Sequence, residues 1–405
     1  MNQFFRSKKL FLTWLLLTCL VFQTISPPQC FACPFCAGVQ ASLLDDLEDT
    51  SEMCVAVCLK CQENPSEPGI YYAELIVTEP LKSKTHTQRQ AKLLVPTFDL
   101  LTPKQAYLVK GYGEQDEFQW VTPTPVDARE IEYLKSLAKF SADNTPKVDR
   151  LKFFFEQRDS SSKLIADDCF NELGKTSLEE LKLLQPWLSP EKIKQSLRDE
   201  KHTTDRKRLD WVLLGICGSP ADGELFEELL AVYHRQRQQD AAQGALLRDP
   251  IGLDAGISTY ITLLGEPGLQ KIEATFLQNP NCDYSECFSA IMAVRVQGDE
   301  IQKFSKERLA KSLAYVLDRQ ELADLVVADL ARWEQWDYAP KLMATYRSSA
   351  SDDLRLRIPI INYLRLCPTP AAELFLQDVR RLEPQMYRRA QTLFPEHKRN
   401  DESMQ

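Results

Sequence analysis

The sequence has few of the residues that most catalytic sites require. Its four histidines lie far apart and form neither an HExxH nor a CxxCH motif: His86, His202, His234 and His397. No GxSxG turn is present, and the 14 glycines include no phosphate-binding loop. These absences argue against zinc-protease, haem and phosphate-loop chemistry. They leave open a Ser–His–Asp triad, because triads assemble from distant positions.

The chain also lacks a basic surplus and a long apolar run. Its 49 basic and 58 acidic residues give a net charge of −9, so we expect no nucleic-acid partner. The apolar segment 10–22 would span about 20 Å as a helix, which is less than the roughly 30 Å hydrocarbon layer. We therefore expect no transmembrane span in the mature chain.

The N-terminal segment has the three parts of a signal peptide. Basic residues between positions 6 and 9 precede the apolar segment 10–22, and small residues precede Cys33. The pattern predicts a signal peptide over 1–32 and export to the periplasm, the cell envelope or the extracellular space. A retained membrane anchor is the alternative.

Cysteine is plentiful, with 12 in the chain. Five are clustered near the predicted mature N-terminus: Cys33, Cys36, Cys54, Cys58 and Cys61. In an oxidising compartment such thiols usually pair, so all five are disulfide candidates. An odd number cannot pair fully within the cluster, and one thiol either stays free or bridges to a later cysteine.

Two other interpretations of the cysteines carry chemistry. The CPFC stretch places Cys33 and Cys36 as a Cys-x-x-Cys dithiol, which predicts a thiol–disulfide oxidoreductase with Cys33 as nucleophile and Cys36 as resolving thiol. Alternatively, the spacing of Cys33, Cys36, Cys58 and Cys61 is close to that of a four-thiolate zinc ribbon. We expect no catalytic residue, metal or cofactor, with the dithiol and zinc as alternatives.

Residues 33–127 form a cysteine-rich β module in the predicted organisation. Short segments rich in Val, Ile, Leu, Tyr and Phe are separated by turn signals, and they predict five strands at 54–60, 70–79, 91–96, 106–112 and 117–121. A helix is expected between Gly38 and Asp49. The pattern suggests a small barrel or sandwich, which ends where Pro123 and Pro125 break it.

The rest of the chain has helical periodicity. A linker helix is expected over 128–145, a helical domain over 146–395 and a disordered tail over 396–405. Similar corners end at Pro220, Pro267 and Pro370, where an apolar helix gives way to an amphipathic one. Such helix pairs predict a HEAT-like α-solenoid. The DRKR run at 205–208 is interpreted as a solvated helix start.

These motifs together carry a resemblance. ACPFC, FQWVTPTPVDAREIEYL, WVLLGICGSPAD and INYLRLCPTP resemble an uncharacterised family of exported, planctomycete-type proteins. The β segment is also similar to netrin-like or OB-type barrels such as the inhibitory domain of tissue metalloproteinase inhibitors. Those domains begin at a Cys-x-Cys, whereas this chain has Cys33-x-x-Cys36.

The sequence as a whole predicts a mainly α protein in which a small OB/netrin-like β module precedes a helical array. We expect an exported interaction or scaffold protein and do not expect an enzyme. Its partner is expected to be a protein or a cell-envelope component, bound through the helical surface.

Overall fold

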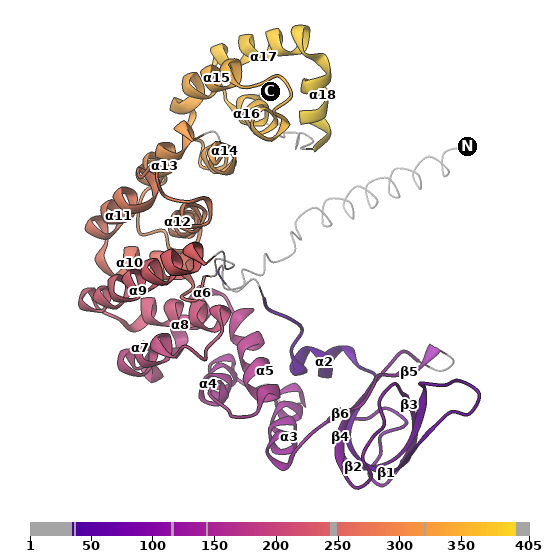
Figure 1. The fold of residues 1–405 in the computed structure, drawn as a ribbon. Helices are drawn as coiled ribbons and strands as arrows, with labels where there is room; N and C mark the ends of the chain where they lie inside the picture. The colour runs from indigo at the N-terminus through magenta and orange to yellow at the C-terminus, as the bar shows by residue number, and fades with distance from the viewer. Residues whose placement is uncertain are drawn as a thin grey trace, which may run out of the picture.

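The computed structural model describes Phe35 and residues 38–114, 117–142, 145–243, 249–319 and 321–393. The predicted signal peptide, Cys33, Cys36 and the predicted tail lie outside these residues. The protein is mainly helical with a small antiparallel sheet, and its helices follow one another along an open arc that has the sheet at one end (Figure 1).

The sheet has the strand order β3-β2-β1-β4-β5, and β6 pairs with β4. Its strands are β1 (Glu52–Glu63), β2 (Tyr71–Lys82), β3 (Lys92–Thr97), β4 (Ala106–Tyr112), β5 (Gln119–Trp120) and β6 (Thr124–Pro125). The five predicted strands are therefore confirmed in position, although β1 is longer than expected and β5 shorter. Within the described residues, no backbone pairing joins the two ends of the order.

The helices are α2 (Leu43–Asp49), α3 (Ala128–Ala142), α4 (Lys147–Gln157), α5 (Lys163–Gly174), α6 (Leu178–Leu181), α7 (Pro190–Arg198), α8 (Thr204–Cys217), α9 (Gly223–Ala242), α10 (Leu253–Leu264), α11 (Glu266–Ile272), α12 (Tyr284–Val296), α13 (Lys306–Ala314), α14 (Ala323–Arg332), α15 (Ala339–Ser348), α16 (Leu354–Leu366), α17 (Pro370–Leu382) and α18 (Pro384–Leu393). Helices α12, α14 and α16 lie on the inner side of the arc, and α11, α13 and α15 lie on the outer side (Figure 1). The inner helix α10 packs between α8 and α12.

The three predicted corners are junctions between helices. In each, one helix ends and a proline stands in the first turn of the next helical segment, where its missing N–H has no intrahelical partner to lose. Pro220 opens the turn that leads into α9, Pro267 lies in α11, and Pro370 begins α17. The sequence pattern thus located helix pairs correctly.

Strand β1 is buried on both faces and joins two hydrophobic cores. Cys54, Ala56 and Cys58 face a small core inside the curled sheet. Met53 and Val55 point the other way and belong to the main core, which continues through α2 and α3 into the helical array. Alternate residues of a strand point to opposite faces, so one segment serves both cores. The sheet and the helices are therefore packed as one body.

The helix expected as a linker is α3, and it is well packed. Leu134 and Leu137 are fully buried between the sheet side and the helices. Immediately before it, the proline-rich segment that was expected to break the β pattern adds the short strand β6. Pro125 can stand there because an end strand loses no ladder bond to its missing N–H.

No helix in the described ranges is long and apolar enough to cross a bilayer.

Glu52 is a buried carboxylate that organises the connection between β2 and β3. It accepts backbone hydrogen bonds from Thr85, His86 and Thr87, and the hydroxyl of Thr87 donates to it at 2.5 Å. Burial alone raises the pKa of Glu52, but these hydrogen bonds outweigh it and lower the pKa to about 2. The ionised form is therefore part of the fold.

We predict that Glu52→Gln lowers the free energy of unfolding by about 2 kcal/mol at pH 7, because the amide nitrogen cannot accept the Thr85–Thr87 donors. Because the folded pKa is lowered, the stabilisation is present above the unfolded value of 4.5 and is lost as the pH falls toward 2. Urea unfolding between pH 7 and pH 2 measures both effects. Glu74→Gln, at an exposed position of β2, is the control. It should change neither the free energy of unfolding at pH 7 nor the loss of stability toward pH 2.

Candidate interaction site on the inner helices

A short extended segment, residues 38–42, lies along the inner helices before α2 begins; we call it the strap. The side chain of Asn171 accepts the backbone N–H of Gln40 at 3.1 Å. One turn earlier on α5, Asp168 accepts the backbone N–H of Leu43 at 2.6 Å, just beyond the strap. Residues three apart on a helix lie on one face, so α5 presents a row of acceptors to an extended chain.

Asp168 is the most constrained member of this row. It is 3% exposed, and the hydroxyl of Tyr133 on α3 also donates to it at 2.6 Å. Burial raises the pKa of Asp168 to about 6, and the hydrogen bonds from Tyr133 and Leu43 oppose that rise. One carboxyl group thus joins α3, α5 and the start of α2.

The end of the strap is held by a charged network. Ser42 caps α2 in a capping box with Asp45, and Lys175 donates to Ser42 Oγ at 3.0 Å and to Asp45 Oδ1 at 2.6 Å. Burial lowers the pKa of Lys175, but hydrogen bonds to Asp45 and Glu172 outweigh it and raise the pKa. A lysine held protonated cannot take a proton from Ser42, so this Ser–Lys contact is structural.

Phe35, from the CPFC stretch, inserts its ring beside the strap. It is 4% exposed and lines a largely apolar cavity of about 180 Å³. The other lining residues come mainly from three inner helical segments: Val212, Gly215 and Ile216; Ser258, Thr259 and Thr262; and Val296 and Ile301. Leu178, Lys182 and Gln185 complete the wall.

Gly215 keeps this cavity open. It lies inside α8, where glycine costs about 1 kcal/mol relative to alanine. Its φ is ordinary, and a Cβ there would meet Thr259 Oγ1 at 3.6 Å, an ordinary contact. Neither the backbone conformation nor the packing of the described residues requires glycine at position 215. The effect of the missing side chain is to leave space in front of α8.

A buried amide bonds two of the α10 residues that line the cavity. Gln297 is fully buried, and its Nε2 donates to the Ser258 carbonyl at 2.8 Å and to Thr262 Oγ1 at 2.9 Å. Its Oε1 has no hydrogen-bond partner among the described residues. Gln297 also begins a single π-helical turn that ends at Ile301, and such turns are common at functional sites.

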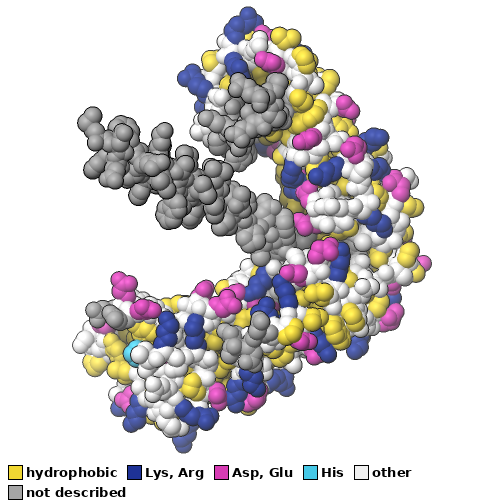
Figure 2. Space-filling model, turned by 180° about the vertical axis from the view of Figure 1, so that it is seen from behind, with side chains coloured by type: hydrophobic (Ala, Val, Ile, Leu, Met, Phe, Trp, Pro, Cys, Tyr) yellow, Lys and Arg dark blue, Asp and Glu magenta, His cyan; other side chains and the backbone are white. Residues whose placement is uncertain are grey.

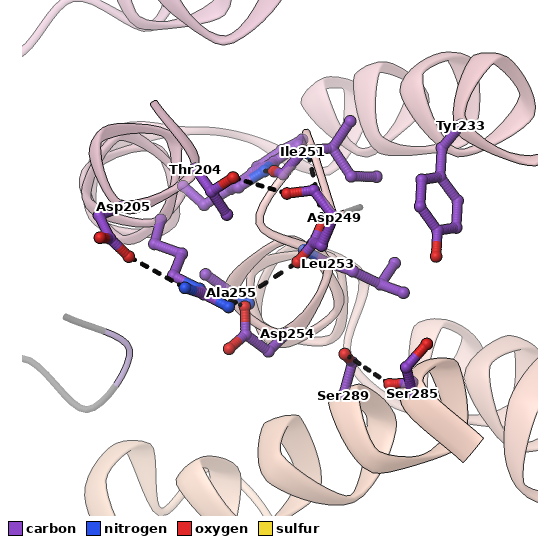
Figure 3. A network of polar contacts seen from close by, with 12 residues as sticks. Thr204, Asp205, Tyr233, Asp249, Ile251, Leu253, Asp254, Ala255, Ser285 and Ser289 are labelled. Carbon is purple, nitrogen blue, oxygen red and sulfur yellow. Dashed lines mark hydrogen bonds and ion pairs between the residues drawn. The ribbon is translucent and has the colours of Figure 1, made fainter. Parts of the chain in front are cut away.

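The strap meets α8 at an acidic cluster. Asp205, Asp249 and Asp254 lie around the junction of α8 and α10 (Figure 3), and Arg208 bonds Asp254 at 2.9 Å and Asp205 at 3.0 Å. A Cβ on Gly38 would lie 2.6 Å from Asp205 Oδ2, so a larger residue there would displace the Asp205 carboxylate. Asp249 accepts the backbone N–H groups of the turn that begins α10 (Figure 3).

The segment 205–208 was expected to be a solvated helix start; the helix start is confirmed, but the solvation is wrong for Lys207 and Arg208. The segment does begin α8, but Lys207 is only 5% exposed and Arg208 is enclosed by carboxylates. A charge run in sequence does not show which of its members face the neighbouring helices.

The described part of the cysteine cluster lies in β1. Cys54, Cys58 and Cys61 carry free thiols. A bulge opposite Glu74 places Cys58 and Cys61 on the same face, because their partners are the inward-facing Leu75 and Ala73. Burial raises the pKa of Cys54 to about 12, and burial followed by the charge of Cys61 raises that of Cys58.

The zinc ribbon, the redox dithiol and any bridge from the N-terminal segment to β1 need Cys33 or Cys36, and both lie outside the described residues. These three interpretations therefore stay predictions. Within the described ranges, no three His, Cys, Asp or Glu side chains are arranged to hold a metal ion.

One serine, histidine and aspartate do converge. Ser196 Oγ lies 2.9 Å from Nδ1 of His202, and its hydroxyl donates to Asp210 Oδ2 at 2.6 Å. In an activated serine the histidine accepts the hydroxyl proton. Here the proton is directed to the aspartate, so this cluster fixes the turn between α7 and α8 and does not generate a nucleophile.

The sequence analysis missed Asp168, Asn171 and Gly215 as site residues, and it treated Phe35 only as a spacer between two cysteines. The sequence features that could have indicated these residues were weak: Asp168 and Asn171 are polar residues on an amphipathic helix, and Gly215 is a glycine inside a helix. Comparisons with protein-family models, curated proteins and solved structures gave no match to this chain. The candidate site therefore rests on geometry.

We predict that Asp168→Ala releases the strap, because Tyr133 Oη and the Leu43 N–H lose a buried acceptor. The free energy of unfolding should fall by about 2–3 kcal/mol, and amide exchange at residues 40–43 should accelerate. Asp167→Ala is the matched control: it removes an exposed i,i+4 pair with Lys163, with an expected cost below about 0.5 kcal/mol. Unchanged protection at Leu43 in Asp168→Ala would contradict the role of α5.

Proposed function

We propose that the protein is an exported interaction protein that binds an extended segment of a protein or cell-envelope partner on its inner helices. In this proposal the helices form a HEAT-like solenoid and the sheet is a barrel-like module of the OB/netrin kind. The paired helices along the arc and the closed core within the curled sheet support these finer assignments (Figure 1).

The observation that carries the proposal is the strap itself. Asn171 and Asp168 accept backbone N–H groups of a chain that lies along α5. Side chains that accept backbone N–H groups can bind an extended peptide whatever its own side chains are. Pockets for the peptide's side chains then add specificity. The surface therefore already binds one peptide segment, which belongs to its own chain.

The cavity beside Phe35 supplies such a pocket. It is lined by apolar side chains on α8 and by the hydroxyls of Ser258, Thr259 and Thr262 on α10. A volume of about 180 Å³ fits a large aliphatic or aromatic side chain and little more. We therefore assign it to one anchor residue of the partner segment, next to Phe35.

Apolar side chains are also visible on the inner side of the arc in the view from behind (Figure 2). Asp205 lies beside Gly38 at the start of the strap and is paired with Arg208. The apolar surface favours a protein segment over nucleic acid, in agreement with the net charge of −9.

A peptide selection tests the proposal. Random 12-residue peptides displayed on phage are selected against the full chain, and synthetic copies are measured by fluorescence polarisation. We expect enriched peptides to share one large apolar anchor and to bind Gly215→Leu at least ~10-fold more weakly, because leucine fills the cavity. The variant should fold, since leucine favours helix more than glycine does.

Glu373→Leu is the matched control, because it adds a leucine to an exposed position of the outer helix α17. It should leave peptide affinity unchanged. Peptides without a common apolar anchor, or equal affinity for wild type and Gly215→Leu, would contradict the proposed site.

A further inference from the structure

A second pair of cysteines, separate from the N-terminal cluster, meets at the start of α12. Asp283 caps this helix, so Cys282 is the residue before the cap and Cys287 is the fourth residue of the helix. Side chains at these two positions normally touch in a hydrophobic staple. Both cysteines are buried, with exposures of 4% and 0%, and both carry free thiols.

The surroundings make the two sulfurs unequal. The hydrogen bond with Cys282 lowers the pKa of Cys287 and outweighs burial, which raises it. The charge of Arg319 lowers this pKa further, and the charge of Glu321, which forms an ion pair with Arg319 at 2.9 Å, opposes that effect. Nη1 of Arg319 is buried and has no hydrogen-bond partner among the described residues. A guanidinium beside a thiol stabilises the thiolate, which is the reactive form.

Cys282 has the opposite environment. Its pKa is raised, first by the hydrogen bond with Cys287 and then by burial and the charge of Glu286. Its thiol lies 3.7 Å from Glu286 Oε2, to which it can donate. One sulfur is therefore set to attack, and the other has a carboxylate that can receive its proton.

We propose that Cys282 and Cys287 are a redox-active dithiol that closes to a disulfide across the first turn of α12. The Cys287 thiolate attacks a small disulfide such as oxidised glutathione, forms a mixed disulfide and releases one glutathione thiolate. Cys282 then gives its proton to Glu286 and attacks the Cys287 sulfur, which expels the second glutathione thiolate. Two protein thiols are oxidised, and one glutathione disulfide is reduced.

The other described cysteines have no such arrangement. Burial raises the pKa of Cys169 to about 12 and that of Cys217 to about 11, and no other described cysteine contributes to either shift. They serve as internal references for a thiol that is present but not activated. Both sulfurs are buried, so closing the pair also needs the turn at the exposed Asn281 to move and admit the oxidant.

Mass spectrometry tests the proposal on the full chain. The protein is equilibrated with mixtures of oxidised and reduced glutathione, quenched with acid, denatured, alkylated and digested with trypsin. Residues 272–295 form one tryptic peptide that contains Cys282 and Cys287 and no other cysteine. We expect this peptide to lose two hydrogens and to escape alkylation, while Cys169 and Cys217 are alkylated.

Three variants separate the roles. Cys282→Ala should trap Cys287 as the glutathione adduct, and Cys287→Ala should leave Cys282 alkylatable without an adduct. Arg319→Gln should slow closure by about tenfold, because it weakens thiolate formation. Cys217→Ala is the control and should close as fast as wild type.

Alkylation of both cysteines in wild type after equilibration with oxidised glutathione would overturn the proposal. So would an equal rate of adduct formation at Cys282 and Cys287 in the two single variants. Melting curves of each variant report whether it is folded, so a loss of reactivity through unfolding is recognised separately.

Discussion

The hydrogen bonds to the buried carboxyl group of Asp168 are the interactions on which the arrangement of α2, α3 and α5 depends. It lies on α5 and accepts hydrogen bonds from Tyr133 on α3 and from the backbone at the start of α2. A buried carboxyl group is costly unless its partners are in place, so these three elements must come together as a unit. The start of α2 is thereby fixed against α3 and α5, and the strap takes its path along α5.

That path explains why the inner surface is suited to a peptide. Extended backbone needs external hydrogen-bond partners, and α5 supplies them at helical spacing through Asp168 and Asn171. The next helices add an open, largely apolar space in front of Gly215, and the buried amide of Gln297 bonds two α10 residues that line this space. Stability is given up at both places, since a helix-interior glycine costs free energy, and so does a buried oxygen that has no hydrogen-bond partner among the described residues. Such costs concentrate where a surface is used.

The reactivity expected of each cysteine follows from its environment and not from its spacing in the sequence. Cys54 and Cys58 fill the core of the curled sheet, where burial disfavours the thiolate. The pair at α12 combines a neighbouring thiol, a guanidinium and a carboxylate, and these groups come from the helix start and from the segment before α14. In sequence, CxxxxC at 282–287 carries no known motif, whereas CxxC at 33–36 does.

By itself, the sequence determined the secondary structure and its order. Alternation of period two located the strands, helical periodicity located the helices, and Pro220, Pro267 and Pro370 marked the corners, because all of these signals act within a few residues. Only the tertiary structure decided which residues form the candidate site. Phe35, Asp168, Asn171 and Gly215 are brought together by contacts between segments more than a hundred residues apart. A local sequence pattern cannot show whether a polar residue of α5 is exposed or accepts a hydrogen bond from the backbone of a distant segment. Likewise, the bulge that turns Cys61 inward depends on the pairing of β1 with β2.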